Sequence, residues 1–259
     1  MAASLHETRL IELIAQSPAR QIFRAEMDGD AYWVKRASLP KAKFLHRLQQ
    51  IAAACLRLPM LSVTASDGGA EALKTEVTRL WRFRAASVHV PEVVAEGERF
   101  YVATDIGSEL QSFLQKMDDT SAQKALIEKA ARALAALHAK GLVHGRPYLR
   151  DMTWDGETIG FLDLEEDPLR VMSFDAAQAR DVWIFLVGCA RFAVQDAEIL
   201  PIAFAAYRAS APAGYEPHLK TLTRLARPLR AFVQKYLWNR VRKNVRFAVM
   251  ANAFLEDHF

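Results

Sequence analysis

Cysteine is scarce in this chain of 259 residues, and long apolar runs are absent. Its two cysteines, Cys55 and Cys189, lie far apart, which excludes the paired spacing of a zinc or iron–sulfur site and a disulfide framework. The longest apolar run, residues 183–194, includes Arg191 and is too short to span a bilayer. The N-terminal MAASLHETRL has no apolar core and therefore predicts no signal peptide. We expect a cytoplasmic protein.

Neither sign of charge dominates the sequence. It has 34 lysines and arginines against 30 aspartates and glutamates, a net charge of +4. An excess this small does not indicate nucleic acid as a partner, and no recognition motif accompanies it. Hydrophobic residues make up 51% of the chain, a composition that forms a sizeable core and excludes a disordered or low-complexity protein.

Turn signals divide the first half of the chain into hairpins. Residues 21–36 form two strand patterns joined at Asp28-Gly29, a dipeptide that supplies the positive φ angles of a tight hairpin. This pattern places Lys35 on the second strand. Two more hairpins are predicted, one over 91–105 around Gly97 and one over 152–164 around Asp155-Gly156.

Helical periodicity fills most of the rest. Apolar residues recur at helical spacing over 40–57, 70–85 and 121–140, and the chain after about residue 174 has helical character. A β-rich part followed by a mostly helical part predicts an α+β fold with two lobes. We place the β-rich N-terminal lobe, with an inserted helix, at residues 1–106 and the helical C-terminal lobe at residues 107–259.

Two aspartates flank the third hairpin. Asp151 lies in the segment HGRPYLRDM just before it, and Asp163 follows its second strand in FLDLEED. The hairpin therefore brings both carboxylates to its open end, where its two strands begin and finish. Magnesium is usually held by one or two carboxylates together with substrate phosphates, so this pattern predicts a magnesium site.

With Lys35 on an early strand and Glu76 on a following helix, the arrangement resembles the protein-kinase-like superfamily. In that family a strand lysine holds the nucleotide phosphates and pairs with a helix glutamate, and a loop H-R-D-x-x-x-x-N precedes a metal-binding D-F-G. The resemblance runs over roughly residues 21–188. Bacterial lipopolysaccharide-core (Kdo or heptose) kinases share the compact HG…DLE pattern and this length. The resemblance implies a two-lobed kinase-like fold with ATP and magnesium as cofactors.

It also implies a role for each matching residue. Asp163 matches the metal-binding aspartate, Asp151 the metal-binding asparagine and His144 the histidine of the catalytic loop. Asp105, at the start of DIGS, matches the hinge where backbone groups meet adenine. Asp181, in DVW, matches an aspartate that buttresses the catalytic loop, and the plainer alternative for it is a helix N-cap.

Three features depart from the family pattern. Arg146 stands where the family has its catalytic aspartate, and a permanently protonated arginine accepts no proton; it is expected to act electrostatically, while Asp151 is a candidate base. The segment 15–20, AQSPAR, lacks the glycines of a phosphate loop. Lys35 and Glu76 are 41 positions apart, so Glu71 is the alternative partner, and a plain surface position is the alternative for Glu76.

The acceptor and the C-terminal segment complete the prediction. Only 18 positions separate Asp163 from Asp181, too few for a long peptide-docking segment, so we expect a sugar or glycolipid acceptor.

The C-terminal segment is basic: residues 217–255 contain no acidic residue. Their apolar face comprises Leu229, Phe232, Val233, Tyr236 and Leu237, with Trp238 beside it, and their basic residues are Lys220, Arg224, Arg227, Arg230, Lys235, Arg240, Arg242, Lys243 and Arg246.

That basic amphipathic pattern is typical of a helix on an anionic membrane surface, here the inner face; packing on the C-terminal lobe is the alternative. The main hypothesis is an ATP- and magnesium-dependent phosphotransferase of the lipopolysaccharide-kinase-like type. The alternatives are a pseudokinase, which binds nucleotide or a partner without phosphoryl transfer, and a peripheral membrane adaptor. No particular oligomeric state is predicted.

Overall fold

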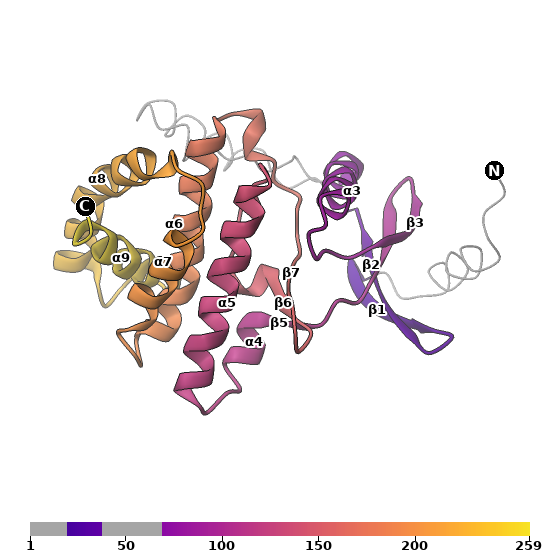
Figure 1. Cartoon of the computed structure of the whole chain (residues 1–259), viewed down its shortest axis with the longest axis horizontal. Coiled ribbons are helices and arrows are strands. Elements are labelled where there is room, and N and C mark those ends of the chain that lie inside the picture. The colour runs from indigo at the N-terminus through magenta and orange to yellow at the C-terminus, as the bar shows by residue number, and fades with distance from the viewer. Residues whose placement is uncertain (1–19, 38–68) are drawn as a thin grey trace.

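The computed structural model describes residues 20–37 and 69–259. Figure 1 shows a small sheet with one helix beside it, a larger group of helices, and short strands between the two. The predicted helix over 40–57, Cys55 and most of the glycine-free segment 15–20 lie outside the described residues.

The N-terminal lobe is a four-stranded antiparallel sheet in the order β1-β2-β4-β3. Asp28 and Gly29 form the first hairpin turn with φ angles of 54° and 92°, the left-handed values that a two-residue hairpin requires. Helix α3 buries Leu73, Val77 and Phe83 on the side of the sheet. The elements are β1 (Ile22–Met27), β2 (Asp30–Arg36), α3 (Gly69–Ala85), β3 (Val93–Gly97) and β4 (Phe100–Thr104).

A second, three-stranded sheet in the order β5-β6-β7 lies between the first sheet and the helices. Gly107 lies in the short connection from β4 to this sheet, the connection that contains the predicted division at residues 106 and 107. Its φ angle is 110°, and a Cβ there would lie 2.6 Å from the Trp154 carbonyl oxygen. The strands of this second sheet are β5 (Ser108–Glu109), β6 (Met152–Trp154) and β7 (Ile159–Phe161). The short helices next to them are α4 (Leu110–Leu114) and η2 (Leu149–Asp151).

Five long helices and two short helical turns form the rest of the C-terminal lobe. Helix α6 is its centre, because residues on all its faces are buried, including Phe185, Leu186 and Cys189. These elements are α5 (Thr120–Ala139), η3 (Pro168–Arg170), α6 (Phe174–Ala193), α7 (Ile199–Arg208), α8 (Tyr215–Phe232), the π-helical turn η4 (Val233–Leu237) and α9 (Lys243–Glu256).

The three predicted hairpins and the helices predicted over 70–85 and 121–140 are confirmed to within a few residues. The α+β, two-lobed class is confirmed as well. Apolar alternation and Asp-Gly turns carried these predictions, because they depend on neighbours in sequence.

Candidate active site

A lysine bridge joins the two lobes. Lys35 lies on β2, and its ammonium nitrogen is 2.8 Å from a carboxylate oxygen of Glu76 on α3 and 3.0 Å from Oδ1 of Asp163. Glu76 is buried, with 3% of its side chain exposed, so the surface alternative for Glu76 is wrong, and Glu76 rather than Glu71 pairs with Lys35. Burial alone would lower the pKa of Lys35, but the Glu76 and Asp163 carboxylates outweigh it and raise that pKa.

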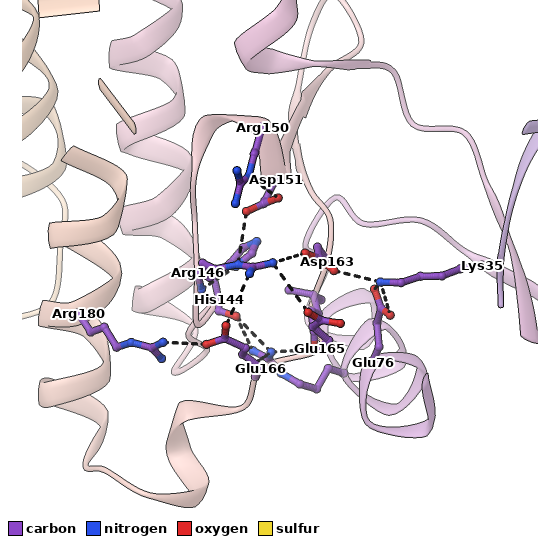
Figure 2. A network of polar contacts seen from close by, with 12 residues as sticks. Lys35, Glu76, His144, Arg146, Arg150, Asp151, Asp163, Glu165, Glu166 and Arg180 are labelled. Atoms are coloured by element: carbon purple, nitrogen blue, oxygen red, sulfur yellow. Dashed lines mark hydrogen bonds and ion pairs between the residues drawn. The ribbon is translucent and has the colours of Figure 1, made fainter. Parts of the chain in front are cut away.

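Asp163 receives a second cation from the loop before β6. An Nη2 nitrogen of Arg146 is 2.5 Å from Oδ2 of Asp163, so each carboxylate oxygen has its own positive partner (Figure 2). Burial raises the pKa of Asp163, but Lys35 and Arg146 outweigh it and hold that pKa below its usual value. Asp163 also has a φ angle of 57°, an uncommon conformation for a residue with a side chain that is often found at functional sites.

Arg146 lies at the centre of a group of carboxylates (Figure 2). Besides Asp163, its guanidinium lies 3.8 Å from Asp151 and 3.9 Å from Glu165 and from Glu166. About a quarter of its side chain is exposed. A permanent cation at this point neutralises acidic groups that would otherwise repel one another and a polyphosphate.

Among these carboxylates, Asp151 has a buried oxygen that lacks a hydrogen-bond partner. Its Oδ2 is buried without a hydrogen-bond partner, and its contacts with Arg146 and Arg150 are ion pairs at 3.8 Å and 3.7 Å. Burial raises the pKa of Asp151 to about 7, although Arg146 opposes the shift. A buried carboxylate oxygen without a partner is suited to a cation or to a proton.

Asp151 and Asp163 are the two carboxylates that could share a magnesium ion: Asp151 has the oxygen without a hydrogen-bond partner, whereas magnesium at Asp163 would compete with Lys35 and Arg146. No group of three or more histidines, cysteines or acidic residues that could hold a metal occurs in residues 20–37 and 69–259. Two carboxylates suffice for magnesium when substrate phosphates supply further ligands.

His144 has a structural position rather than a catalytic one. It is fully buried, and its Nδ1 accepts a hydrogen bond from the Arg146 backbone nitrogen at 3.2 Å. Burial lowers the pKa of His144 to about 4, so the ring is neutral near pH 7. His144 does not line the cleft between the lobes, and it fixes the backbone that presents Arg146.

Asp181 anchors the same loop. Its carboxylate accepts hydrogen bonds from the backbone nitrogens of His144 at 2.6 Å and Gly145 at 2.9 Å. The N-cap alternative for Asp181 is wrong, because α6 begins at Phe174 with Ser173 as its cap. Gly145 is required at its position, since its φ angle is 100° and a Cβ would lie 2.8 Å from the Glu166 carbonyl oxygen.

Arg79 is a loop-binding residue that the sequence did not reveal. It is buried on α3, and its guanidinium donates to the carbonyl oxygens of Val143, His144, Leu164 and Glu166. One side chain thus ties the segment before the hairpin to the segment after it. The only signal was its place three residues after Glu76, which puts both on one face of the helix.

These residues border a cleft with a volume of about 390 Å³. Its wall includes the charged residues Lys35, Glu76, Asp151 and Asp163 and apolar residues such as Leu80 and Ile106. This volume is within the range of small-molecule and cofactor sites. The cleft therefore offers both apolar surface and paired charges to a ligand.

Asp105 lines the same cleft at the connection between the lobes. Its carboxylate accepts hydrogen bonds from the Gly107 backbone nitrogen at 3.1 Å and from Arg24 at 3.2 Å. Its side chain therefore shapes the connection at the edge of the cleft.

Comparison with known proteins yields distant similarities. No protein-family profile matches the chain. An uncharacterized protein of Haemophilus influenzae is 28% identical over 155 residues, which are 60% of this chain and 57% of that protein. Two solved structures align along 96–97% of this chain and 97% of their own. One is the streptomycin–ATP–APH(2″)-IIa ternary complex, at 11% identity and a TM-score of 0.42; the other is ADP-bound aminoglycoside phosphotransferase APH(2″)-Ib, at 12% and 0.43.

The chain's own architecture is that of a two-lobed kinase-like fold. A small antiparallel sheet with one helix precedes a larger helical lobe, and the strand lysine pairs with the helix glutamate beside a carboxylate that follows the last hairpin. The resemblance described above predicts such a pairing of a strand lysine with a helix glutamate. The predicted fold is confirmed.

Proposed function

We propose that the protein is an ATP- and magnesium-dependent phosphotransferase of the lipopolysaccharide-kinase-like type. The observation that carries the proposal is the lysine bridge, in which Lys35 contacts both Glu76 and Asp163 in the wall of a 390 Å³ cleft. An ammonium group held by two carboxylates beside a cleft of this size is suited to the phosphates of a bound nucleotide.

Each residue then has a stated task. Lys35 binds the nucleotide phosphates, Glu76 orients it, and the connection at Asp105 borders the base. Asp163 and Asp151 would hold magnesium, which would neutralise phosphate charge when bound.

Arg146 occupies the position of the family's catalytic aspartate, so proton acceptance and charge stabilisation are assigned to two different residues, Asp151 and Arg146. Arg146 accepts no proton, and it stabilises negative charge on the transferring phosphoryl group. As the alternative to holding magnesium, Asp151 is the carboxylate that takes the proton of the acceptor hydroxyl, since one of its oxygens has no hydrogen-bond partner and its pKa is raised to about 7 by burial.

A sugar or glycolipid is the proposed acceptor. Between Asp163 and the start of α6 at Phe174, the chain forms only the short turn η3. This leaves little surface on which a peptide could dock. A small acceptor needs only a hollow beside Asp151.

We further propose that an anionic membrane surface binds helix α8 and the turn η4. Leu225, Leu229, Phe232 and Tyr236 follow one another at helical spacing, and between 45% and 66% of each is exposed. Val233 is instead buried, so part of the predicted apolar face packs inward. Basic residues flank the exposed stripe, a combination that favours an anionic bilayer. No helix in the described ranges is long and apolar enough to cross a membrane.

A pseudokinase is the second candidate, and one observation favours it. Arg146 occupies Oδ2 of Asp163 at 2.5 Å, so a protein cation already neutralises the carboxylate that would bind magnesium. In this alternative, nucleotide binds without transfer.

Transfer from ATP to a panel of sugars and detergent-dispersed glycolipids tests the proposal. We expect the wild type to transfer phosphate and Asp151→Asn to lose at least a hundredfold in rate, with nucleotide affinity retained. Asp257→Asn, an exposed aspartate that does not line the cleft, is the matched control. Nucleotide binding without transfer to any acceptor would favour the pseudokinase.

A further inference from the structure

A second, smaller hollow lies beside the cleft. Its volume is about 110 Å³, and α4, the loop before β6, α6 and α9 all contribute to its wall. Arg150 lines both this hollow and the cleft. Because Asp151 follows Arg150 in the chain and lines the cleft, a molecule in the hollow would lie next to the proposed base.

Two guanidinium groups give the hollow its charge. Arg150 comes from the loop and Arg191 from the last turn of α6, while none of the other lining residues is acidic. Each arginine stacks on an aromatic ring: Arg150 lies 4.9 Å from the centre of Tyr148, and Arg191 lies 5.3 Å from the centre of Phe247. Both rings also line the hollow, so they hold the guanidinium groups at its wall.

The positive charge of the hollow is only slightly compensated. In the described part of the chain no carboxylate forms an ion pair with Arg191, although Asp118 lines a neighbouring hollow together with it. The ion pair of Arg150 in those residues is with Asp151, at 3.7 Å. Gln111 and Asn244 add amide groups to the wall; an amide NH2 can donate to an oxyanion or a hydroxyl, and an amide oxygen can accept from a hydroxyl.

We infer that this hollow binds an oxyanion, a phosphate or a carboxylate, carried by the acceptor sugar. The inference rests on the proposed phosphotransferase function and names its substrate class. Arginine is the side chain best suited to planar, two-point binding of such groups. The volume is well below the 300–1,000 Å³ of whole-ligand sites, so the hollow suits the anionic group rather than the entire acceptor.

An anion site next to Asp151 would make the protein select acceptor sugars by their charge. An acceptor whose anionic group lies between Arg150 and Arg191 extends toward Asp151, so that a hydroxyl a few bonds away reaches the base. A neutral sugar loses the guanidinium contacts, and a cationic acceptor is repelled. Anionic sugars are therefore expected to bind at least tenfold more tightly than their neutral parents.

Calorimetric titration in the presence of saturating non-hydrolysable ATP analogue tests the inference, since the analogue keeps the probe out of the cleft. The probes are inorganic phosphate, glucose 6-phosphate, glucuronate and neutral glucose; the second and third distinguish a phosphate from a carboxylate group. The variants are Arg191→Gln and Arg191→Glu. Arg170→Gln, an exposed arginine outside the hollow, is the matched control. Affinity for the analogue and the melting temperature are measured for every variant.

We expect at least one anionic probe to bind saturably, Arg191→Gln to weaken it tenfold or more, Arg191→Glu to abolish it, and Arg170→Gln to leave it unchanged. Equal affinity for glucose and the anionic probes would overturn the inference, as would binding that is insensitive to both Arg191 variants or no saturable binding of any probe. Failure of the proposed function itself has a different signature: either the ATP analogue does not bind, or it binds and the transfer assay gives no phosphorylated product with any acceptor, whichever probes bind the hollow.

Discussion

At the residue scale, Arg146 is the cation that neutralises the carboxylates of the site. Its guanidinium lies within ion-pair distance of Asp151, Asp163, Glu165 and Glu166. A neutral residue in its place would leave partly buried carboxylates facing one another without a cation. Removing one partner of a buried charge pair is costly because the remaining charge stays desolvated.

We predict that Arg146→Gln lowers the free energy of unfolding by about 2 kcal/mol. Millimolar magnesium should restore part of that loss, because the carboxylates regain a cation. Urea unfolding with and without magnesium measures both effects, and Arg170→Gln is the control for loss of one positive charge. A variant as stable as the wild type in both conditions would show that Arg146 does not neutralise the site.

His144 gives a pH-dependent prediction. Burial lowers its pKa from 6.5 to about 4, so between those values the unfolded chain binds a proton that the folded chain does not. Stability contributed by neutral His144 is therefore fully present above about pH 6.5 and is lost as the pH falls toward 4. The total loss is about 3 kcal/mol.

Comparison of the wild type with His144→Gln isolates this contribution. Asp151, whose pKa is raised to about 7 by burial, changes stability in the opposite direction but is common to both proteins. We expect the difference in unfolding free energy between them to shrink by 2–3 kcal/mol from pH 7 to pH 4. A difference that stays constant over this range would contradict a neutral buried His144.

At the scale of the elements, the backbone conformation of the connection from β4 to β5 depends on Gly107. Gly107→Ala would place a Cβ against the Trp154 backbone in addition to a φ angle of 110°. Gly141 also has a positive φ, of 70°, but a Cβ there meets nothing within 4 Å. Comparison of the two separates the steric clash from the backbone conformation.

We predict that Gly141→Ala costs about 1 kcal/mol and that Gly107→Ala costs at least about 1 kcal/mol more, since Trp154 belongs to β6 and its backbone yields less easily than a side chain. Thermal unfolding of both variants measures the two costs. Equal costs would mean that the connection accommodates the methyl group without strain.

The exposed stripe on α8 and η4 gives the prediction for membrane binding. Leu229→Gln with Phe232→Gln removes two side chains that are 66% and 51% exposed, so folding should be unaffected. We expect co-sedimentation with vesicles of anionic phospholipid to fall at least tenfold, and wild-type binding to weaken as salt screens the basic residues.

The control is Val194→Gln, which changes a side chain that is 64% exposed at the end of α6. Undiminished sedimentation of the double variant, or equal binding to neutral and anionic vesicles, would exclude the stripe as the membrane-binding surface.

At the scale of the whole molecule, two kinds of information predicted different parts of the site. Turn dipeptides and periodicity placed Lys35 on a strand and Glu76 on a helix, but their pairing across 41 positions came only from the family resemblance. The bridge from Arg146 to Asp163 and the four carbonyl contacts of Arg79 were not predictable, because they depend on distances between segments that no local pattern encodes. The buried position of Val233 within the apolar face has the same cause.

The central claim is that the lysine bridge and Asp163 form a working nucleotide site between the lobes. Its most direct test is the melting temperature of the wild type and of Asp163→Asn with ATP alone, magnesium alone, and both, with Asp257→Asn as the control. A ligand at a hundredfold excess over its dissociation constant stabilises the folded state by about 2.7 kcal/mol. We predict a magnesium-dependent ATP shift of that order in the wild type and in Asp257→Asn, and its loss in Asp163→Asn. No shift in the wild type, or an equal shift in Asp163→Asn, would contradict the claim.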